Sequence, residues 1–379
     1  MYSARPSLSS VFLWNTFFSF VLTGATFSVY FQQSPGGCGD YPQNFEVMFY
    51  GMGIGAVLAI VFLVVYPRIP NAFITQTFFL TVIRYFLALT LLNYGFAKVF
   101  VSQFPHMMAN MDARFVELSP MRVAWAFFGY SKGYQEFLGW GEVIPGILLL
   151  FRRTTLLGAI LAFTVMLNVF LINIFFDVCV KLNSGIYAAL ALYIMLQETG
   201  RLWNFFFTNR ITGPRVDYLI EKPRWFKITG RVINYLALAY IIWAAADDAW
   251  SISWSRSQAH VAQTPVQGPW KTSFVSEWKN NQWESKNAAD TLFVNRIFFD
   301  GYNGVIRSDF IRDRFRFSVD STGNLLTVSF TNARNEWNTA PVKWKYERAS
   351  SDSLKLWIKW KQDSLMVKCA LRKENLTRY

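Results

Sequence analysis

The segment from Thr154 to Phe176 reads TTLLGAILAFTVMLNVFLINIFF and contains no charged residue. An α-helix rises about 1.5 Å per residue, so this segment is long enough to cross the roughly 30 Å hydrocarbon layer of a bilayer. The whole chain has 53% hydrophobic and only 16% charged residues, and its 379 residues include three cysteines. This composition predicts an integral membrane protein. It excludes a disordered chain and a disulfide-rich secreted domain.

Six further apolar segments extend this pattern, so the sequence predicts a polytopic α-helical membrane protein with about seven spans. These segments are Val11–Phe31, Phe45–Tyr66, Phe73–Val101, Tyr134–Phe151, Ser184–Leu196 and Arg231–Ala246. The Lys and Arg residues of the short loops, such as Arg152 and Arg153, place the N-terminus in the cytoplasm by the positive-inside rule. We therefore expect a bacterial inner (cytoplasmic) membrane protein with a periplasmic C-terminal domain.

The pattern of hydrophobic residues changes near Ser251. Residues 251–269 are mostly polar and are interpreted as a linker, and beyond them the hydrophobic period becomes two, which is typical of half-buried strands. In one run Leu354, Leu356 and Ile358 alternate with basic or aromatic residues. Residues 270–379 therefore predict a small antiparallel all-β domain, either a sandwich or a lipocalin-like barrel. One face is apolar and includes Cys369, and the other is basic.

Five polar residues lie within the expected spans and form a candidate intramembrane polar site: Arg84, Lys98, Glu142, Asn168 and Asp177. An ionisable side chain at mid-bilayer costs at least about 2.5–3.5 kcal/mol, so such residues usually face a helix bundle or a cavity. We expect Glu142 to pair with Lys98 across a helix interface. The pair either lines a pocket for a head group, a quinone or a proton, or acts only as a structural ion pair that fixes helix register.

Two cysteines are expected on the outer side of the membrane. Cys38 lies in the first outer loop and Cys179 at the outer end of the fifth expected span. They are a candidate thiol pair that forms a disulfide or acts beside a quinone; two unrelated thiols are the alternative, because no Cys-x-x-Cys motif joins them. No metal site is expected, since the chain holds only two histidines.

Two segments resemble a known family. The segment Arg84–Lys98, RYFLALTLLNYGFAK, resembles the opening helix of DoxX-type membrane proteins, with its Arg, hydrophobic run and Gly-x-x-Lys. Gly141–Gly146, GEVIPG, resembles the Glu-x-x-x-Gly helix of that family. The resemblance covers roughly residues 78–200. The β extension resembles that of longer DoxX-like proteins of Bacteroidetes type in layout.

The hydropathy pattern and the resemblance over residues 78–200 together predict a domain order, and the resemblance implies a general role. Two N-terminal transmembrane helices (1–77) precede a DoxX-like four-helix unit (78–200), a basic cytoplasmic loop with the last span (201–250), the linker (251–269) and the β domain (270–379). The implied role is a quinone- or thiol-linked redox component of the cell envelope, with Arg84, Lys98 and Glu142 as the matching polar positions.

The alternative is a non-catalytic assembly or anchoring subunit whose β domain binds a membrane or periplasmic partner. The expected partner of the helices is the bilayer, and nucleic acid is not expected.

Overall fold

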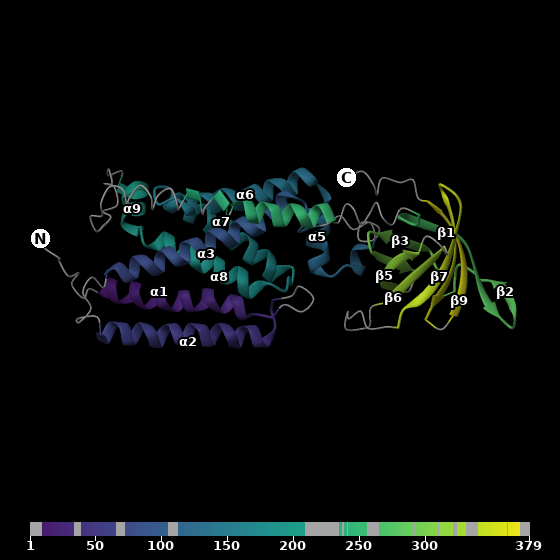
Figure 1. Ribbon diagram of the computed structural model, residues 1–379, viewed down its shortest axis with the longest axis horizontal. Helices are drawn as coiled ribbons and strands as arrows, with labels where there is room; N and C mark the ends of the chain where they lie inside the picture. The colour runs from purple at the N-terminus through teal and green to yellow at the C-terminus, as the bar shows by residue number, and fades with distance from the viewer. Residues whose placement is uncertain are drawn as a thin grey trace, which may run out of the picture. The chain divides into compact units, whose positions relative to one another are not determined.

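The computed structural model places the chain in two compact units (Figure 1). The helical unit comprises residues 1–103 and 133–250, and the barrel unit comprises residues 104–132 and 251–379. The described residues are 10–33, 39–65, 73–104, 113–208, 235–236, 239–240, 242–255, 265–290, 293–309, 311–320, 324–330, 340–361 and 363–371.

The helical unit is built from long apolar helices. Its elements are α1 (Ser10–Ser28), the 3-10 turn η1 (Val29–Phe31), α2 (Pro42–Val65), α3 (Phe73–Val99), α6 (Lys132–Leu150), α7 (Thr155–Phe175), α8 (Lys181–Leu196), α9 (Thr199–Trp203) and the π-helical turn η5 (Asn204–Thr208). Residues 242–255 are also helical. The core is formed mainly by α3, α6, α7 and α8, and Ala249 packs into it.

Four helices among the described residues are long and apolar enough to cross a membrane, at Phe12–Phe31, Pro42–Val65, Phe78–Val99 and Thr155–Phe175. The expected count of seven spans is therefore not supported. The helix at Tyr134–Phe151 exists as α6, but it carries Lys132, Glu136 and Glu142. The helix at Ser184–Leu196 exists as α8, whose 16 residues span only about 24 Å. Most of Arg231–Ala246 lies outside the described residues.

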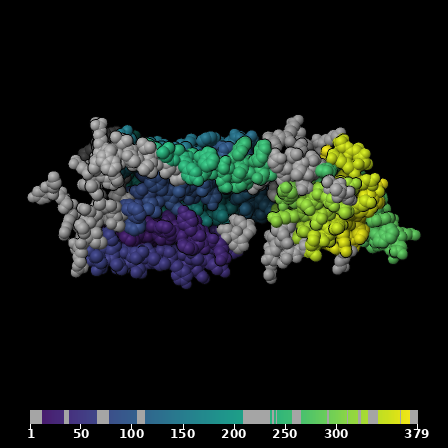
Figure 2. All heavy atoms as spheres, in the orientation of Figure 1, coloured from purple at the N-terminus to yellow at the C-terminus, as the bar shows by residue number. Residues whose placement is uncertain are grey.

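The first two helices pack through glycines. A Cβ atom added to Gly24 would meet the carbonyl oxygen of Gly51, and one added to Gly55 would meet that of Phe20. The missing side chains therefore let α1 and α2 touch backbone to backbone, as small residues do at membrane helix interfaces. Most of the rest of α2 is exposed and apolar. In Figure 2 the two helices (purple) form one continuous side of the helical unit, which suits contact with lipid.

The barrel unit contains an eight-stranded antiparallel barrel. The strands are β1 (Gly268–Lys279), β2 (Gln282–Ser285), β3 (Arg296–Asp300), β4 (Asn303–Arg307), β5 (Arg312–Asp320), β6 (Leu325–Phe330), β7 (Val342–Ser350), β8 (Ser353–Trp360) and β9 (Asp363–Leu371). Strands β3 to β9 follow one another in sequence order, and β1 pairs with both β3 and β9, which closes the barrel. The short β2 pairs with the far end of β1 and lies outside this circuit. Of the two predicted forms, the structure has the barrel.

The barrel interior follows the predicted alternation. Leu354, Leu356 and Ile358 are buried, whereas the intervening residues are exposed or half-buried. The largest fully buried side chains there include Trp270, Trp344 and Trp360. Cys369 is a buried, free thiol of this core, as its position on the apolar face predicts.

The segment before α6 belongs to the barrel unit, although the sequence analysis treats it as an outer loop of the membrane unit. It contains the 3-10 turn η4 (Phe115–Glu117) and the helix α5 (Pro120–Tyr130). We call residues 104–132 the cover segment. The carboxylate of Glu117 accepts a hydrogen bond from the guanidinium of Arg307 on β4 at 2.8 Å, which ties the segment to the barrel.

Candidate functional site

A buried ion pair joins α3 and α6. The ammonium nitrogen of Lys98 lies 2.6 Å from Oε2 of Glu142, and the two side chains are 8% and 2% exposed. The Lys98 ammonium also lies 3.5 Å from the backbone carbonyl oxygen of Tyr94, one turn earlier. The predicted contact between Lys98 and Glu142 is therefore present. In this low-dielectric position each charge depends on the other, because an unpaired one would be costly to bury.

Glycines explain why the two charges meet. Gly95 lies three residues before Lys98, and Gly139 lies three residues before Glu142. A Cβ added to Gly95 would approach Val143, and one added to Gly139 would approach the Gly95 carbonyl oxygen at 2.7 Å. The helices therefore cross in close backbone contact at this pair of glycines. Lys98 and Glu142 each lie within one turn of this crossing, so their side chains are within reach of one another.

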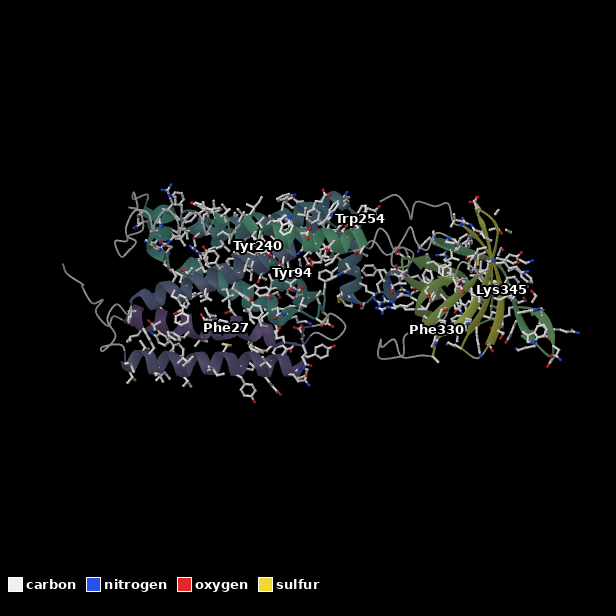
Figure 3. The ribbon with its side chains drawn as sticks, in the orientation of Figure 1. Phe27, Tyr94, Tyr240, Trp254, Phe330 and Lys345 are labelled. Atoms are coloured by element: carbon white, nitrogen blue, oxygen red, sulfur yellow. The ribbon has the colours of Figure 1, made fainter. Side chains whose placement is uncertain are left out.

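Tyrosines form one wall of this site. The ammonium of Lys98 lies 5.7 Å from the ring centre of Tyr94, which is within the range of a cation–π contact. The rings of Tyr94 and Tyr187 on α8 are 6.2 Å apart. Tyr94 is labelled within the helical unit in Figure 3. We call Tyr94, Lys98, Glu142 and Tyr187 the polar cluster.

Arg84 has a different neighbour. It is 8% exposed, and its guanidinium donates a hydrogen bond of 3.2 Å to the hydroxyl of Thr155, at the start of α7. Arg84 and Lys98 lie on one helix fourteen residues apart, which corresponds to about 21 Å along the axis. The structure therefore does not bring Arg84 to the polar cluster, and the expected common site contains only Lys98 and Glu142 of the three charged positions.

The remaining two candidate residues are exposed. Asn168 lies on an exposed face of α7. The side chain of Asp177, beyond the C-terminal end of α7, is 80% exposed, and its carboxylate lies 2.8 Å from the ammonium of Lys181. Asn173, which the sequence analysis did not select as a site residue, is buried instead and donates a hydrogen bond to Ser184 on α8.

Cys179 is disulfide-bonded, and Cys369 is free. Cys38, the predicted partner of Cys179, lies outside the described residues. The backbone N–H groups of Gly39 and Asp40 both donate to the carbonyl oxygen of Cys179, at 2.7 and 3.0 Å. The chain on the C-terminal side of Cys38 is thus held directly against the α7–α8 connection.

Asp40 fixes this connection further. Its carboxylate accepts hydrogen bonds from the backbone N–H groups of Lys181 and Leu182, at 2.9 and 3.0 Å. These are the first two residues of α8, whose N–H groups have no partner within the helix. Asp40 therefore acts as an N-cap supplied by a distant part of the chain, and its negative charge suits the positive end of the helix dipole.

Sequence reasoning missed Tyr94, Tyr187, Thr155 and Asp40. Tyr94 carried a usable signal, because a residue four positions before Lys98 on a helix lies on the same face. The other three are brought to their partners by tertiary packing, which no short sequence pattern encodes.

The polar cluster has the chemical groups that a quinone head group needs. An ammonium and phenol hydroxyls can donate to quinone carbonyls, a carboxylate can accept from quinol hydroxyls, and the neighbouring Phe86 ring, 6.1 Å from Tyr187, is apolar. Among the described residues no group of three or more His, Cys, Asp or Glu side chains could hold a metal ion.

Comparisons with known proteins give one informative match. The chain is 35% identical over 133 residues to an uncharacterized protein of Bacillus subtilis (strain 168), YwoB, and the match covers 85% of that protein and 35% of this chain. No family model matches the chain. No solved structure matches it either.

Proposed function

The chain belongs to the family of the Bacillus subtilis protein YwoB, and we propose that it is a DoxX-like membrane protein that acts as a quinone- or thiol-linked redox component of the cell envelope. The observation that carries this proposal is the buried pair of Lys98 and Glu142 with two tyrosines around it. A buried ion pair often contributes little net stability, so its presence within membrane helices favours a functional role.

The disulfide of Cys179 supports the redox part of the proposal. Tyr187 lies six residues into α8, about 9 Å along the helix from Lys181, and Cys179 lies just before that helix. Cys179 and the polar cluster are thus connected through one short helix, α8. The proposed pair is Cys38 with Cys179. Oxidation of two thiols to a disulfide releases two electrons and two protons, which is the number that one quinone accepts when it becomes a quinol.

The residues of the polar cluster have distinct roles in this proposal. Lys98, Tyr94 and Tyr187 donate hydrogen bonds to the head group, and Glu142 accepts or gives a proton while Lys98 keeps its charge compensated. The pair also excludes bulk water, since both side chains are almost fully buried. Arg84 and Thr155 lie apart from this chemistry and stabilise the α3–α7 packing.

The first experiment measures quinone in the purified protein. Protein purified in mild detergent is extracted with solvent, and the extract is analysed by mass spectrometry. We expect quinone at close to one molecule per chain in wild type, and at least a tenfold loss in Glu142→Gln and Lys98→Met. Asn168→Leu, on an exposed face of α7, is the control and should retain quinone. Equal quinone content in all four proteins would contradict the proposal.

The second experiment follows the thiols. The protein is reduced and freed from reductant, a soluble quinone is added, and the remaining thiols are alkylated. We expect two thiols to disappear per quinol formed, and no such reaction in Cys179→Ser. Burial raises the pKa of Cys369 to about 12, so this thiol stays protonated and unreactive near neutral pH. Quinol formation that is equally fast in Cys179→Ser would exclude the thiol reaction.

A non-catalytic assembly or anchoring subunit is the second candidate. It is favoured by the β1–β2 hairpin, where the exposed Trp278 and Trp283 rings lie 5.2 Å apart outside the barrel circuit. Exposed tryptophans are common at protein interfaces. Crosslinking in cells tests this function: a stoichiometric partner that is lost in Trp283→Ser but retained in Glu142→Gln would favour it over the redox function.

The proposed location is the bacterial inner membrane, with the N-terminus in the cytoplasm and the barrel in the periplasm. Single cysteines introduced at exposed Ser273 on β1 and at Arg153 between α6 and α7 test this orientation in a background that carries both Cys38→Ser and Cys179→Ser. A membrane-impermeant maleimide applied to intact spheroplasts should label Ser273→Cys and not Arg153→Cys. Labelling of both positions from the same side would contradict the proposed orientation.

A further inference from the structure

One side of the barrel carries lysines on its outer surface. Trp344 on β7, Leu356 on β8 and Val367 on β9 point into the core, so the residues that alternate with such positions point outward. On β7, β8, β9 and β1 these outward residues include six lysines and one acidic residue, a net charge of 6 − 1 = +5: Lys343, Lys345, Glu347, Lys355, Lys359, Lys368 and Lys271. We call this outer surface of the four strands the basic face.

Aromatic rings lie among these lysines. Lys345, labelled in Figure 3, is directly opposite Trp357 on β8, and its ammonium lies 5.5 Å from the centre of that ring. The ammonium of Lys355 lies 4.5 Å from the same ring, and that of Lys368 on β9 lies 5.4 Å from the ring centre of Phe274 on β1. These cation–π contacts hold the lysine stems against the sheet while the ammonium groups stay at the surface.

The lysines of the basic face repel one another. Lys355 is directly opposite Lys368, and like charges in this arrangement are destabilising. Glu347 is directly opposite Lys355 on the other side, yet no ion pair within 4.0 Å joins these two residues in the described part of the barrel. The same holds there for Lys345 and Lys368, which contact aromatic rings and no carboxylate. An external anionic surface would therefore replace repulsion by attraction.

The basic face lies across the barrel from the contact of the cover segment. The closed circuit of strands runs β1, β3, β4, β5, β6, β7, β8, β9, so β8 is four strands from β4 in either direction. Glu117 of the cover segment contacts Arg307 on β4. On the opposite side Lys345, Lys359 and Lys368 are exposed and available to a partner.

We propose that the basic face binds the anionic head groups of the bilayer that holds the helical unit. A lysine near an anionic membrane surface strengthens binding about fivefold, and Trp and Phe favour the boundary between head groups and acyl chains. A lipid surface suits separate exposed lysines, because it presents many mobile charges and needs no matching shape.

The connection to the helical unit favours this bilayer over other anionic surfaces. Only 267 − 255 = 12 residues join the helix at residues 242–255 to β1. A short tether gives the membrane of the helical unit a high effective concentration at the barrel. The inference rests on the proposed membrane location of the helical unit and is independent of the redox function.

The test uses the full-length chain in nanodiscs, with a polarity-sensitive fluorophore on a single introduced cysteine in a background that carries Cys38→Ser and Cys179→Ser. Ser364→Cys places the probe on the outer side of β9, within the basic face, and Ser318→Cys places it on β5, four strands away. Cys369 is buried and stays unlabelled. With about 30% phosphatidylglycerol in phosphatidylcholine nanodiscs, the emission of Ser364→Cys should shift to the blue and that of Ser318→Cys should not.

Charge variants show whether the lysines cause the shift. In the Ser364→Cys protein, Lys355→Gln with Lys368→Gln should lower the ratio of bound to free barrel about tenfold or more, since each lysine contributes about fivefold. Arg316→Gln, which removes a positive charge from an exposed position on β5, should change this ratio by less than about twofold. The Tm of the double lysine variant should not fall, because the change removes repulsion. Sodium chloride at about 0.5 M should reverse most of the shift.

Three outcomes would overturn the proposal. Equal shifts of Ser364→Cys and Ser318→Cys, or a shift that the double lysine variant retains, would show that the basic face does not contact the lipid. A shift that appears only when phosphatidylglycerol vesicles are added to the chain in phosphatidylcholine nanodiscs would assign the face to a second membrane. No shift in either case would leave the face to an acidic protein partner. Quinone content, measured on the same samples, should be unchanged by the lysine variants, which separates this result from that for the polar cluster.

Discussion

At the scale of single residues, the contact between Lys98 and Glu142 links the chemistry of the helical unit to its stability. Each side chain is almost fully buried and has the other within 2.6 Å. Removing one charge therefore leaves the other without its compensation, whereas removing both leaves an apolar interface. The same logic does not apply to Asp177, whose exposed carboxylate is solvated whether or not it contacts Lys181.

We predict that Glu142→Gln destabilises the protein by about 3–5 kcal/mol, because it leaves the Lys98 ammonium buried beside an amide. The double variant Lys98→Met with Glu142→Leu should recover most of this loss. Unfolding in mixed micelles of Lys98→Met, Glu142→Leu and the double variant, analysed as a double-mutant cycle, measures the coupling. Additive effects of the two single changes would show that the two side chains do not depend on one another.

At the scale of the elements, glycines determine where the helices cross. Gly139 lies at the α3–α6 crossing, whereas an added Cβ at Gly141, in the same helix, would have nothing within 4 Å. The two positions therefore provide a matched pair in which the same substitution has opposite consequences.

We predict that Gly139→Ala destabilises the protein by about 1–3 kcal/mol, because the new methyl group meets the backbone of Gly95 and Val99 and forces the helices apart. Gly141→Ala should be neutral or stabilise by up to about 1 kcal/mol, since alanine favours the helix. Thermal unfolding in detergent measures both. Equal destabilisation by the two substitutions would contradict the close crossing.

The cap on α8 gives a second prediction at this scale. Asp40→Ala removes the acceptor of two backbone N–H groups and should cost about 0.5–2 kcal/mol. Asp177→Ala is the control, because Asp177 contacts the side chain of Lys181 on the surface only. Hydrogen exchange of residues 181–184 should accelerate in Asp40→Ala and stay unchanged in Asp177→Ala.

The sequence predicted the β-strands best, because alternating hydrophobic residues have one physical cause. The alternation in β8 and β9 follows from one buried face, and the barrel confirms it. The count of seven spans is not supported among the described residues, because α6 carries three charged side chains and buries Glu142 against α3, and α8 is short. The contacts of Tyr187 and Asp40 were not predictable, because they join residues that are far apart in the chain.

At the scale of the whole molecule, the barrel unit is discontinuous in sequence. Its strands come from the C-terminal third of the chain, and the cover segment comes from the connection between α3 and α6. Phe298 and Val305 alternate in their strands with the interior residues Ile297 and Ile306, so they point to the outer face of the barrel, yet they are only 2% and 9% exposed. We expect the cover segment to bury them, because Glu117 in this segment contacts Arg307 on the same face.

We predict that residues 265–371 expressed alone form a barrel with an exposed apolar patch that binds a hydrophobic dye. Adding a peptide of residues 104–132 should abolish dye binding and raise the Tm, since burying Phe298 and Val305 is worth about 1.5–3 kcal/mol each. A peptide with Glu117→Lys, which places a positive charge beside Arg307, should act more weakly. An isolated barrel that binds no dye would show that the cover segment is not needed.

The discontinuity of the barrel unit has a consequence for biosynthesis. The ribosome finishes the cover segment at residue 132 and the last barrel strand at residue 371, which is 371 − 132 = 239 residues later. At about 5–20 residues per second this delay is roughly 10–50 s. For most of that interval Glu117 has no Arg307 to contact, so the cover segment cannot take its place in the barrel unit until translation is almost complete.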